Sequence, residues 1–145
     1  MKVLMQRVSE ASVVVNGETI GEIGRGLLLL VGIEAHDDEA LVRRMAERVV
    51  GYRVFPDDEG RMNRDVRDIG GELLAVSQFT LAADTRKGRR PGFSRAAAPQ
   101  AGKHLFDFCV ACLEAQAVPV QTGRFGADMR VSLVNDGPVT FLLEM

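Results

Sequence analysis

The sequence of 145 residues contains no tryptophan, only two cysteines and two histidines, and no long hydrophobic run. Its longest uninterrupted aliphatic stretch has five residues, from Leu27 to Val31, whereas a membrane-spanning helix needs about 20 apolar residues. The first ten residues also lack the extended apolar core and the small-residue cleavage site of a secretory signal peptide. These absences argue against a membrane partner and favour a cytoplasmic protein.

The sequence marks of several enzyme classes are missing as well. There is no G-x-S-x-G nucleophile motif, no phosphate-binding P-loop and no G-x-G-x-x-G dinucleotide fingerprint. His36 precedes an expected helix and His104 lies within another, so neither histidine belongs to a ligand-like cluster. Two such histidines with two cysteines make a poor metal site. We therefore expect neither a metal nor another cofactor.

The two cysteines form the motif Cys109-Val-Ala-Cys112, which in another context indicates a redox centre. Apolar residues between Pro99 and Leu113 recur at helical spacing, and both cysteines fall on the apolar face. We interpret them as buried core thiols. The alternative, a small redox protein, requires an accessible thiol of low pKa.

The net charge is small, at −2, but it is unevenly distributed. Residues 86–95, here called the cationic loop, hold five of the 18 basic residues and none of the 20 acidic ones. A cationic loop on an acidic body indicates a local anionic partner. An ordinary solvated loop is the alternative. The five cations are Arg86, Lys87, Arg89, Arg90 and Arg95.

Local patterns predict the order of strands and helices. Residues 2–15 and 18–24 predict a hairpin, because Asn16-Gly17 is a strong two-residue turn signal. Residues 26–33 predict a strand covered on both faces. A helix over 38–52 is capped by Asp37 or Asp38. We further expect a strand at 52–55, a polar turn-rich segment at 56–71, a strand at 72–84, a helix at 99–117 and two or three closing strands within 118–144. This order predicts one α/β domain over residues 1–145, with a mixed sheet and few helices.

Two polar interruptions stand out against these apolar strands. One is Ser77-Gln78-Phe79-Thr80, just before the cationic loop, and the other is Asn135-Asp136-Gly137-Pro138-Val139-Thr140 near the end of the chain. Strand ends offer unpaired backbone N–H groups that can stabilise an oxyanion. Solvent-facing alternation explains the first interruption equally well, and a tight turn is a simple explanation of the second.

The residues around both interruptions resemble a known family. The segments "LLAVSQFTLAADTRKGRRPGFS" and "FGADMRVSLVNDGPVTF" are similar to the two signature segments of the bacterial D-aminoacyl-tRNA deacylases. The opening residues resemble the amino terminus of that family, and the similarity runs from residue 1 to 144. The resemblance implies layered sheets with helices on one side. It also implies a homodimeric hydrolase that cleaves the ester between a D-amino acid and tRNA, and glycyl-tRNA as well.

The resemblance also implies roles for individual residues. A cis Gly137-Pro138 unit is expected to enter the pocket of the other subunit and to reject L-aminoacyl substrates. That pocket is expected to contain Ser77, Gln78, Phe79 and Thr80. The expected supporting residues are Arg7 and Asn135 around the Gly-Pro unit, and Ala111 and Met129 near the pocket wall. Gly92 and Arg95 depart from the serine and the acid expected in the family.

The expected chemistry needs few side chains. Backbone N–H groups near Gln78 and Phe79 are expected to hold the oxyanion. Thr80 is a nucleophile or an orienting group, and because no base stands ready to activate it, we favour assistance from the substrate's 2′-hydroxyl. Arg86, Lys87, Arg89 and Arg90 are expected to contact tRNA. A non-catalytic module that binds RNA or an aminoacyl group is the alternative.

Overall fold

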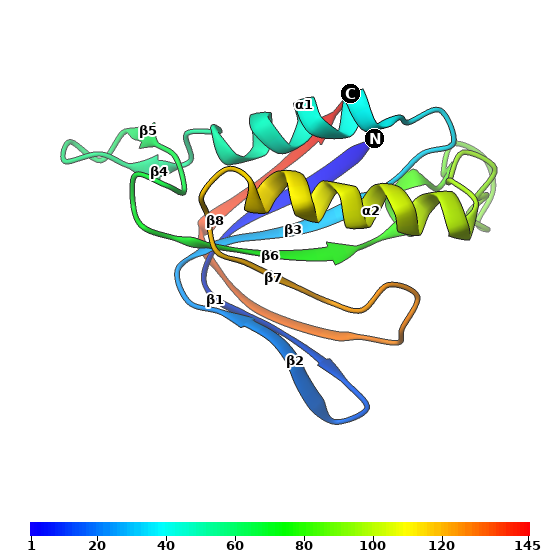
Figure 1. Ribbon diagram of the computed structural model, residues 1–145, viewed down its shortest axis with the longest axis horizontal. Coiled ribbons are helices and arrows are strands. Elements are labelled where there is room, and N and C mark those ends of the chain that lie inside the picture. The colour runs from blue at the N-terminus through cyan, green and yellow to red at the C-terminus, as the bar shows by residue number, and fades with distance from the viewer.

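The computed structural model describes residues 1–145, and it places two α-helices on one side of a curved six-stranded sheet (Figure 1). This arrangement confirms the expected mixed sheet with helices on one side. Neither helix is both long and apolar enough to cross a membrane. The elements are β1 (Lys2–Val15), β2 (Glu18–Ile23), β3 (Gly26–Gly32), α1 (Glu39–Val50), β4 (Phe55–Pro56), β5 (Met62–Arg64), β6 (Glu72–Ser77), the 3₁₀ helix η1 (Phe79–Ala82), α2 (Pro99–Glu114), β7 (Val120–Thr122) and β8 (Arg130–Glu144).

The long strand β1 organises the sheet. Its first half pairs antiparallel with β3, its second half pairs antiparallel with β2, and its other edge pairs with β8. The β1–β2 turn has φ values of 50° at Asn16 and 78° at Gly17, which confirms the expected tight hairpin. Strands β3, β6 and β7 run parallel to one another. Because β1 bends, β2 and the start of β8 lie below the helical layer (Figure 1).

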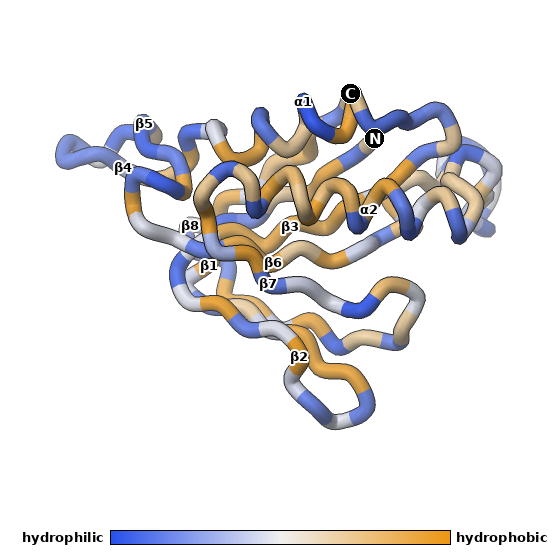
Figure 2. The backbone as a smooth tube through the Cα atoms, viewed as in Figure 1, coloured by the Kyte–Doolittle hydropathy of each residue, from blue (hydrophilic) through white to orange (hydrophobic).

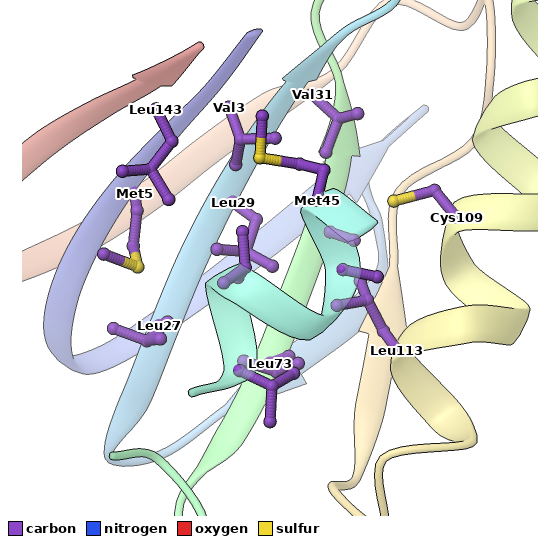
Figure 3. Packing of buried hydrophobic residues seen from close by; sticks show 14 of the residues in the cluster. Val3, Met5, Leu27, Leu29, Val31, Met45, Leu73, Cys109, Leu113 and Leu143 are labelled. Carbon is purple, nitrogen blue, oxygen red and sulfur yellow. The ribbon is translucent and has the colours of Figure 1, made fainter. Parts of the chain in front are cut away.

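Strand β3 is covered on both faces, as its continuous apolar run predicts. Leu27, Leu29 and Val31 belong to the larger core under α1 and α2. Leu28 points to the opposite face and joins a second core under the curled part of the sheet. Figure 3 shows the larger core, in which Met45 of α1 packs over the β3 side chains on the helical face of the sheet, such as Leu29 and Val31. The hydropathy colouring follows the same division, with hydrophobic colour along β3 and β6 and hydrophilic colour on the outer turns (Figure 2).

Both helices begin where the sequence predicts. Asp38, not Asp37, caps α1, and its carboxylate accepts a hydrogen bond from the Leu41 N–H at 2.8 Å. Pro99 occupies the first turn of α2, where its missing N–H has no partner to lose. The helix ends at Glu114, three residues before the expected end.

Both cysteines of α2 are buried, with Cys109 3 % exposed and Cys112 7 % exposed. Figure 3 shows Cys109 directed from α2 toward the core. Burial raises the pKa of the Cys109 thiol to about 12, and burial also raises the pKa of Cys112. The interpretation as core thiols is confirmed, and the redox alternative loses the accessible, low-pKa thiol that it requires.

Two strand predictions need correction, and a third is confirmed. The strand expected at 52–55 is reduced to Phe55–Pro56, which pairs with β5 inside the polar segment. The strand expected to reach residue 84 ends at Ser77, because its parallel partner β3 ends at Gly32 and offers no further ladder. The final strand β8 runs without a hairpin through Gly137-Pro138, so residues 118–144 form two strands, which agrees with the two or three expected.

Candidate active site

A cavity of about 450 Å³ opens where the parallel strands β3 and β6 end. Parallel strands carry their carboxyl ends to the same edge of a sheet, and such edges are where ligands bind in α/β proteins. Ile33 follows β3 there, and Ser77 ends β6. The rest of the wall comes from the start of α2 and from the segment between β7 and β8. The lining residues are mostly apolar: Ile33, Val76, Ser77, Gln78, Phe79, Ala97, Pro99, Gly102, Phe125, Gly126, Ala127, Met129 and Val131.

The end of β6 presents free backbone donors at this cavity. The N–H of Gln78 donates to the Val31 carbonyl at 2.8 Å, so, contrary to expectation, this amide is not free to hold an oxyanion. The N–H groups of Phe79 and Thr80 begin the 3₁₀ helix, so no earlier residue of that helix offers them a carbonyl. Phe79 lines the cavity. Its N–H is therefore the donor best placed to meet a developing negative charge.

The side chain of Thr80 has one polar neighbour. Its Oγ1 accepts a hydrogen bond from the Gln78 side-chain amide. No histidine, lysine or carboxylate hydrogen-bonds to it, and His104 instead pairs with Glu39 at 2.9 Å. A threonine nucleophile needs a base. The chain supplies an orienting partner for this hydroxyl and no base.

The second interruption is a wide bulge in β8. Asn135 pairs opposite Val8 and Thr140 pairs opposite Gln6, so four residues of β8 lie opposite Arg7 alone. Within the bulge the Gly137-Pro138 peptide bond is cis. Neither residue lines the cavity of its own chain. The structure therefore keeps the two interruptions apart within one chain.

Arg7 and Asn135 hold this bulge by its backbone. The Arg7 guanidinium donates from Nε to the Asp136 carbonyl at 3.0 Å and from Nη1 to the Val54 carbonyl at 2.6 Å. The Asn135 amide donates to the carbonyls of Arg7 and Val139, both at 2.9 Å. Together these bonds span both ends of the bulge and tie it to β1.

Gly137 has no room for a side chain. Its φ is 134°, and a Cβ placed there would lie 2.7 Å from Val139 Cγ2 and 2.9 Å from the Val139 nitrogen. The Arg7 Nη2 would lie at 3.1 Å. The bulge therefore requires glycine here for both its conformation and its space.

Comparisons with known proteins identify the family of this chain. The family model described as D-Tyr-tRNA(Tyr) deacylase matches residues 4–144. The chain belongs to that deacylase family. By this membership it is a hydrolase. A protein of Alcanivorax borkumensis named D-aminoacyl-tRNA deacylase is 68 % identical over 100 % of both chains, and one of Vibrio cholerae with the same name is 59 % identical over 99 % of both.

Solved structures show the same deacylase fold. One described as c-Myc DNA Unwinding Element Binding Protein has a TM-score of 0.95 and 38 % identity, covering 100 % of this chain and 99 % of that one. One described as a probable eukaryotic D-amino acid tRNA deacylase has a TM-score of 0.84 and covers 99 % of this chain and 98 % of that one. At 17 % identity the second likeness concerns the fold alone.

The structure corrects one expected wall residue of the deacylase. Met129 lines the cavity, as expected, but Ala111 lies on the exposed face of α2. The α2 residue that lines the cavity is instead Gly102. It lies nearer the start of the helix than Ala111, by about 13 Å at a rise of 1.5 Å per residue. A Cβ at Gly102 would lie 3.6 Å from the Phe125 ring, which is ordinary contact. A glycine on the apolar side of a helix was the signal available in the sequence.

The cationic loop separates its charges into two groups. Arg86 is paired with Asp84, with Nη2 and Oδ2 2.6 Å apart, and hydrogen bonds from Arg86 hold the pKa of Asp84 well below its usual range. Lys87, Arg89 and Arg90 are exposed and make no ion pair with the protein. These three are the charges free to meet an anion, whereas Arg86 stabilises the loop.

Arg95, one of the two departures from the family pattern, anchors the end of the loop. Its Nη2 lies 3.1 Å from Oε1 of the buried Glu34. Burial alone would raise the pKa of Glu34. The hydrogen bond and charge of the Met1 α-ammonium, followed by the charge of Arg95, outweigh burial and hold that pKa below its ordinary value.

His36 does lie beside carboxylates, contrary to the sequence prediction. Ligand atoms of Glu34, His36 and Asp37 lie within 4.8 Å of one another. However, the Met1 α-ammonium already donates to Glu34 at 3.0 Å and to Asp37 at 2.7 Å. The two carboxylates therefore have a cation partner from the chain itself.

Proposed function

We propose that this deacylase hydrolyses D-aminoacyl-tRNA and releases the free D-amino acid and tRNA. The observation that carries the proposal is the free Phe79 N–H at the mouth of an apolar cavity, in a chain that matches the deacylase family over residues 4–144. Relatives that cover the whole chain carry the same activity in their names. In this proposal residues 1–145 form one domain. The enzyme acts in the cytoplasm, where aminoacyl-tRNA is found.

In the proposed reaction, water adds to the carbonyl carbon of the ester. The oxyanion that forms accepts a hydrogen bond from the Phe79 N–H, which is already oriented and needs no rearrangement. The bond from that carbon to the 3′ oxygen then breaks, and the proton lost by water reaches that oxygen through the neighbouring 2′-hydroxyl. Thr80, oriented by Gln78, positions the water. Ser77 shapes the wall beside them.

Chiral selection is the finer part of the proposal. The Gly137-Pro138 bulge is exposed and held by Arg7 and Asn135, but it is remote from its own cavity. We place it in the cavity of a second subunit, where its backbone occupies the position of an L side chain. Selection then depends on a clash, and a D side chain points to open space. Glycyl-tRNA has no side chain to exclude and is also cleaved.

The binding partners follow from the same surfaces. Lys87, Arg89 and Arg90 hold tRNA phosphates, because they are exposed and lack a protein acid. A homodimer completes each site and covers the apolar side chains that β8 leaves exposed. The exposed apolar residues near the end of the chain are Val134, Phe141, Leu142 and Met145.

A non-catalytic binding module is the second candidate function. It is favoured by the lack of any base at Thr80 and by a 38 % identical structure that is described as a DNA-element-binding protein. In this reading the cationic loop binds nucleic acid and the cavity holds an aminoacyl group without turnover.

Single-turnover deacylation distinguishes the two. Radiolabelled D-aminoacyl-, L-aminoacyl- and glycyl-tRNA are each mixed with excess enzyme, and release of the amino acid is timed. We expect the D and glycyl esters to be cleaved at least ~10³ times faster than the L ester, a difference of about 4 kcal/mol. Binding of all three without cleavage establishes the module. Cleavage of D-aminoacyl-tRNA but not of glycyl-tRNA keeps the enzyme and removes selection by clash alone.

A further inference from the structure

Two exposed aromatic rings touch beside the mouth of the cavity. Phe79 is 56 % exposed and Phe93 is 41 % exposed. Their ring centroids are 5.2 Å apart, with the planes tilted by 54°. Phe79 lines the cavity, and Phe93 belongs to the cationic loop. Aromatic pairs of this kind are usually buried in a core or an interface. An exposed pair beside a cavity is therefore a candidate surface for binding a ligand.

The position of Phe93 is set by the backbone on both sides of it. Gly92 and Asp84 exchange two backbone hydrogen bonds, of 3.1 and 2.7 Å, which close the base of the loop. Two residues after Phe93, the side chain of Arg95 pairs with the buried Glu34 at 3.1 Å. The ring is therefore presented at a defined place relative to the cavity.

Free positive charge lies in the same loop. Lys87, Arg89 and Arg90 have no acidic partner in the chain. An aromatic surface next to unpaired cations is the combination by which proteins bind single-stranded nucleic acid, since bases stack on the rings and phosphates meet the charges.

We propose that Phe79 and Phe93 form a platform on which an unpaired base of the tRNA 3′ end stacks. This deepens the proposed function and rests on it. The ester enters the cavity beside the Phe79 N–H, the base covers the two rings, and the cations of the loop hold phosphates of the same strand. A second copy of the chain is a poorer occupant, because its apolar surface would cover the rings and desolvate three unpaired cations.

The experiment compares the wild type with Phe93→Leu, which keeps apolar bulk without a ring, and with Phe93→Trp, which restores one. Met62→Leu is the matched control, since Met62 is 45 % exposed but lies on β5, in the separate two-stranded β4–β5 sheet. KM and kcat are measured with D-aminoacyl-tRNA. In parallel, uncharged tRNA carrying 2-aminopurine at each unpaired 3′ position in turn reports stacking by loss of fluorescence.

We expect Phe93→Leu to raise KM roughly tenfold or more with kcat nearly unchanged. Fluorescence quenching at one position should disappear in Phe93→Leu, and both properties should return in Phe93→Trp. Equal KM values, quenching that does not depend on the ring, or failure of Phe93→Trp to restore them overturns the platform. A changed oligomeric state of Phe93→Leu in sedimentation also overturns it in favour of a subunit contact. If the wild type itself cleaves no D-aminoacyl-tRNA, the proposed function fails instead, and the quenching series still decides the platform.

Discussion

At the scale of single residues, the candidate site depends on backbone groups more than on side chains. The Gln78 N–H is used by the sheet, whereas the Phe79 N–H one residue later is free. Gly137 admits no Cβ, and Arg7 holds the adjoining carbonyl at 3.0 Å. Two consecutive N–H groups at the end of β6 thus differ in role: that of Gln78 holds the sheet together, and that of Phe79 is a candidate catalytic donor.

Replacement of Gly137 tests the tightness of the bulge. A Cβ would meet the Val139 nitrogen at 2.9 Å, so Gly137→Ala must shift the backbone in addition to adopting an unfavourable φ. We expect a loss of about 1–3 kcal/mol in unfolding free energy and a large loss of D-aminoacyl-tRNA turnover, measured by urea unfolding and single-turnover kinetics. Gly60→Ala is the control, because Gly60 has a φ of 78° but open space around it. Equal effects of the two variants would contradict the steric argument.

Thr80→Ala tests whether this hydroxyl reacts or only orients. Because no base contacts it, we expect the variant to keep turnover within about tenfold of the wild type. A tRNA ending in 2′-deoxyadenosine should lose roughly 10²-fold or more, the usual size of lost acid–base assistance. Both are measured as single-turnover rates. Abolished turnover in Thr80→Ala together with a normal rate for the deoxy substrate would make the threonine the nucleophile.

At the scale of elements, helix α2 and the cationic loop each combine residues that stabilise the fold with residues that are available to a ligand. The start of α2 lines the cavity through Pro99 and Gly102, and its second half buries the two cysteines. In the loop, Arg86 stabilises the turn, while Arg89 and Arg90 remain free. The residue type alone, basic or apolar, does not show whether a residue stabilises the fold or faces a ligand.

Neutralising Arg89 and Arg90 together should weaken tRNA binding and its salt dependence. Two lost phosphate contacts reduce the slope of log K against log salt by roughly 1.4 to 1.8. The measurement is a salt titration of tRNA affinity for the Arg89→Gln, Arg90→Gln double variant. Arg44→Gln with Arg48→Gln is the control, since these exposed residues of α1 make no ion pair and the charge change is the same. A slope that matches this control would return the loop to an ordinary solvated surface.

The thiols of α2 should resist labelling in the folded protein. The folded pKa of Cys109, about 12, lies above its ordinary value of 9.0. Its thiol form therefore adds stability below pH 9, and that contribution is lost as the pH rises toward 12. We expect iodoacetamide to modify Cys109 at pH 8 far more slowly in the native protein than in urea. Rapid native labelling would revive the redox alternative.

At the scale of the whole molecule, the two signature segments form separate features of one chain. The cavity and the Gly137-Pro138 bulge lie at different places on one chain, although both sequence segments carry the family resemblance. The exposed apolar residues of β8, including Leu142 at 49 % exposure, lie on the same strand as the bulge. The proposed homodimer would account for both features at once.

Leu142→Lys tests this assembly. Because Leu142 is exposed in one chain, the charge should leave the fold intact but separate the subunits, with loss of turnover. Sedimentation velocity, circular dichroism and deacylation are the measurements. Met62→Lys, at a similarly exposed position on β5, should change none of them. A fully active monomer would remove the shared site.

The sequence by itself determined the features that depend on neighbours in the chain. Asn16-Gly17 closes the hairpin, one of Asp37 and Asp38 caps α1, and Pro99 begins α2, because turn and cap signals act over a few residues. The continuous apolar run of β3 likewise indicated burial on both faces. The signature segments indicated the family, which the match over residues 4–144 shows.

Only the tertiary structure decided which groups meet. Strand β6 ends at Ser77 because its partner β3 stops, and that ending leaves the Phe79 N–H free. The bulge of β8 is defined by its pairing with β1, more than 120 residues away in sequence. Gly102, and not Ala111, reaches the cavity because helical phase and depth select it. These features depend on long-range pairing and packing, which local patterns do not specify.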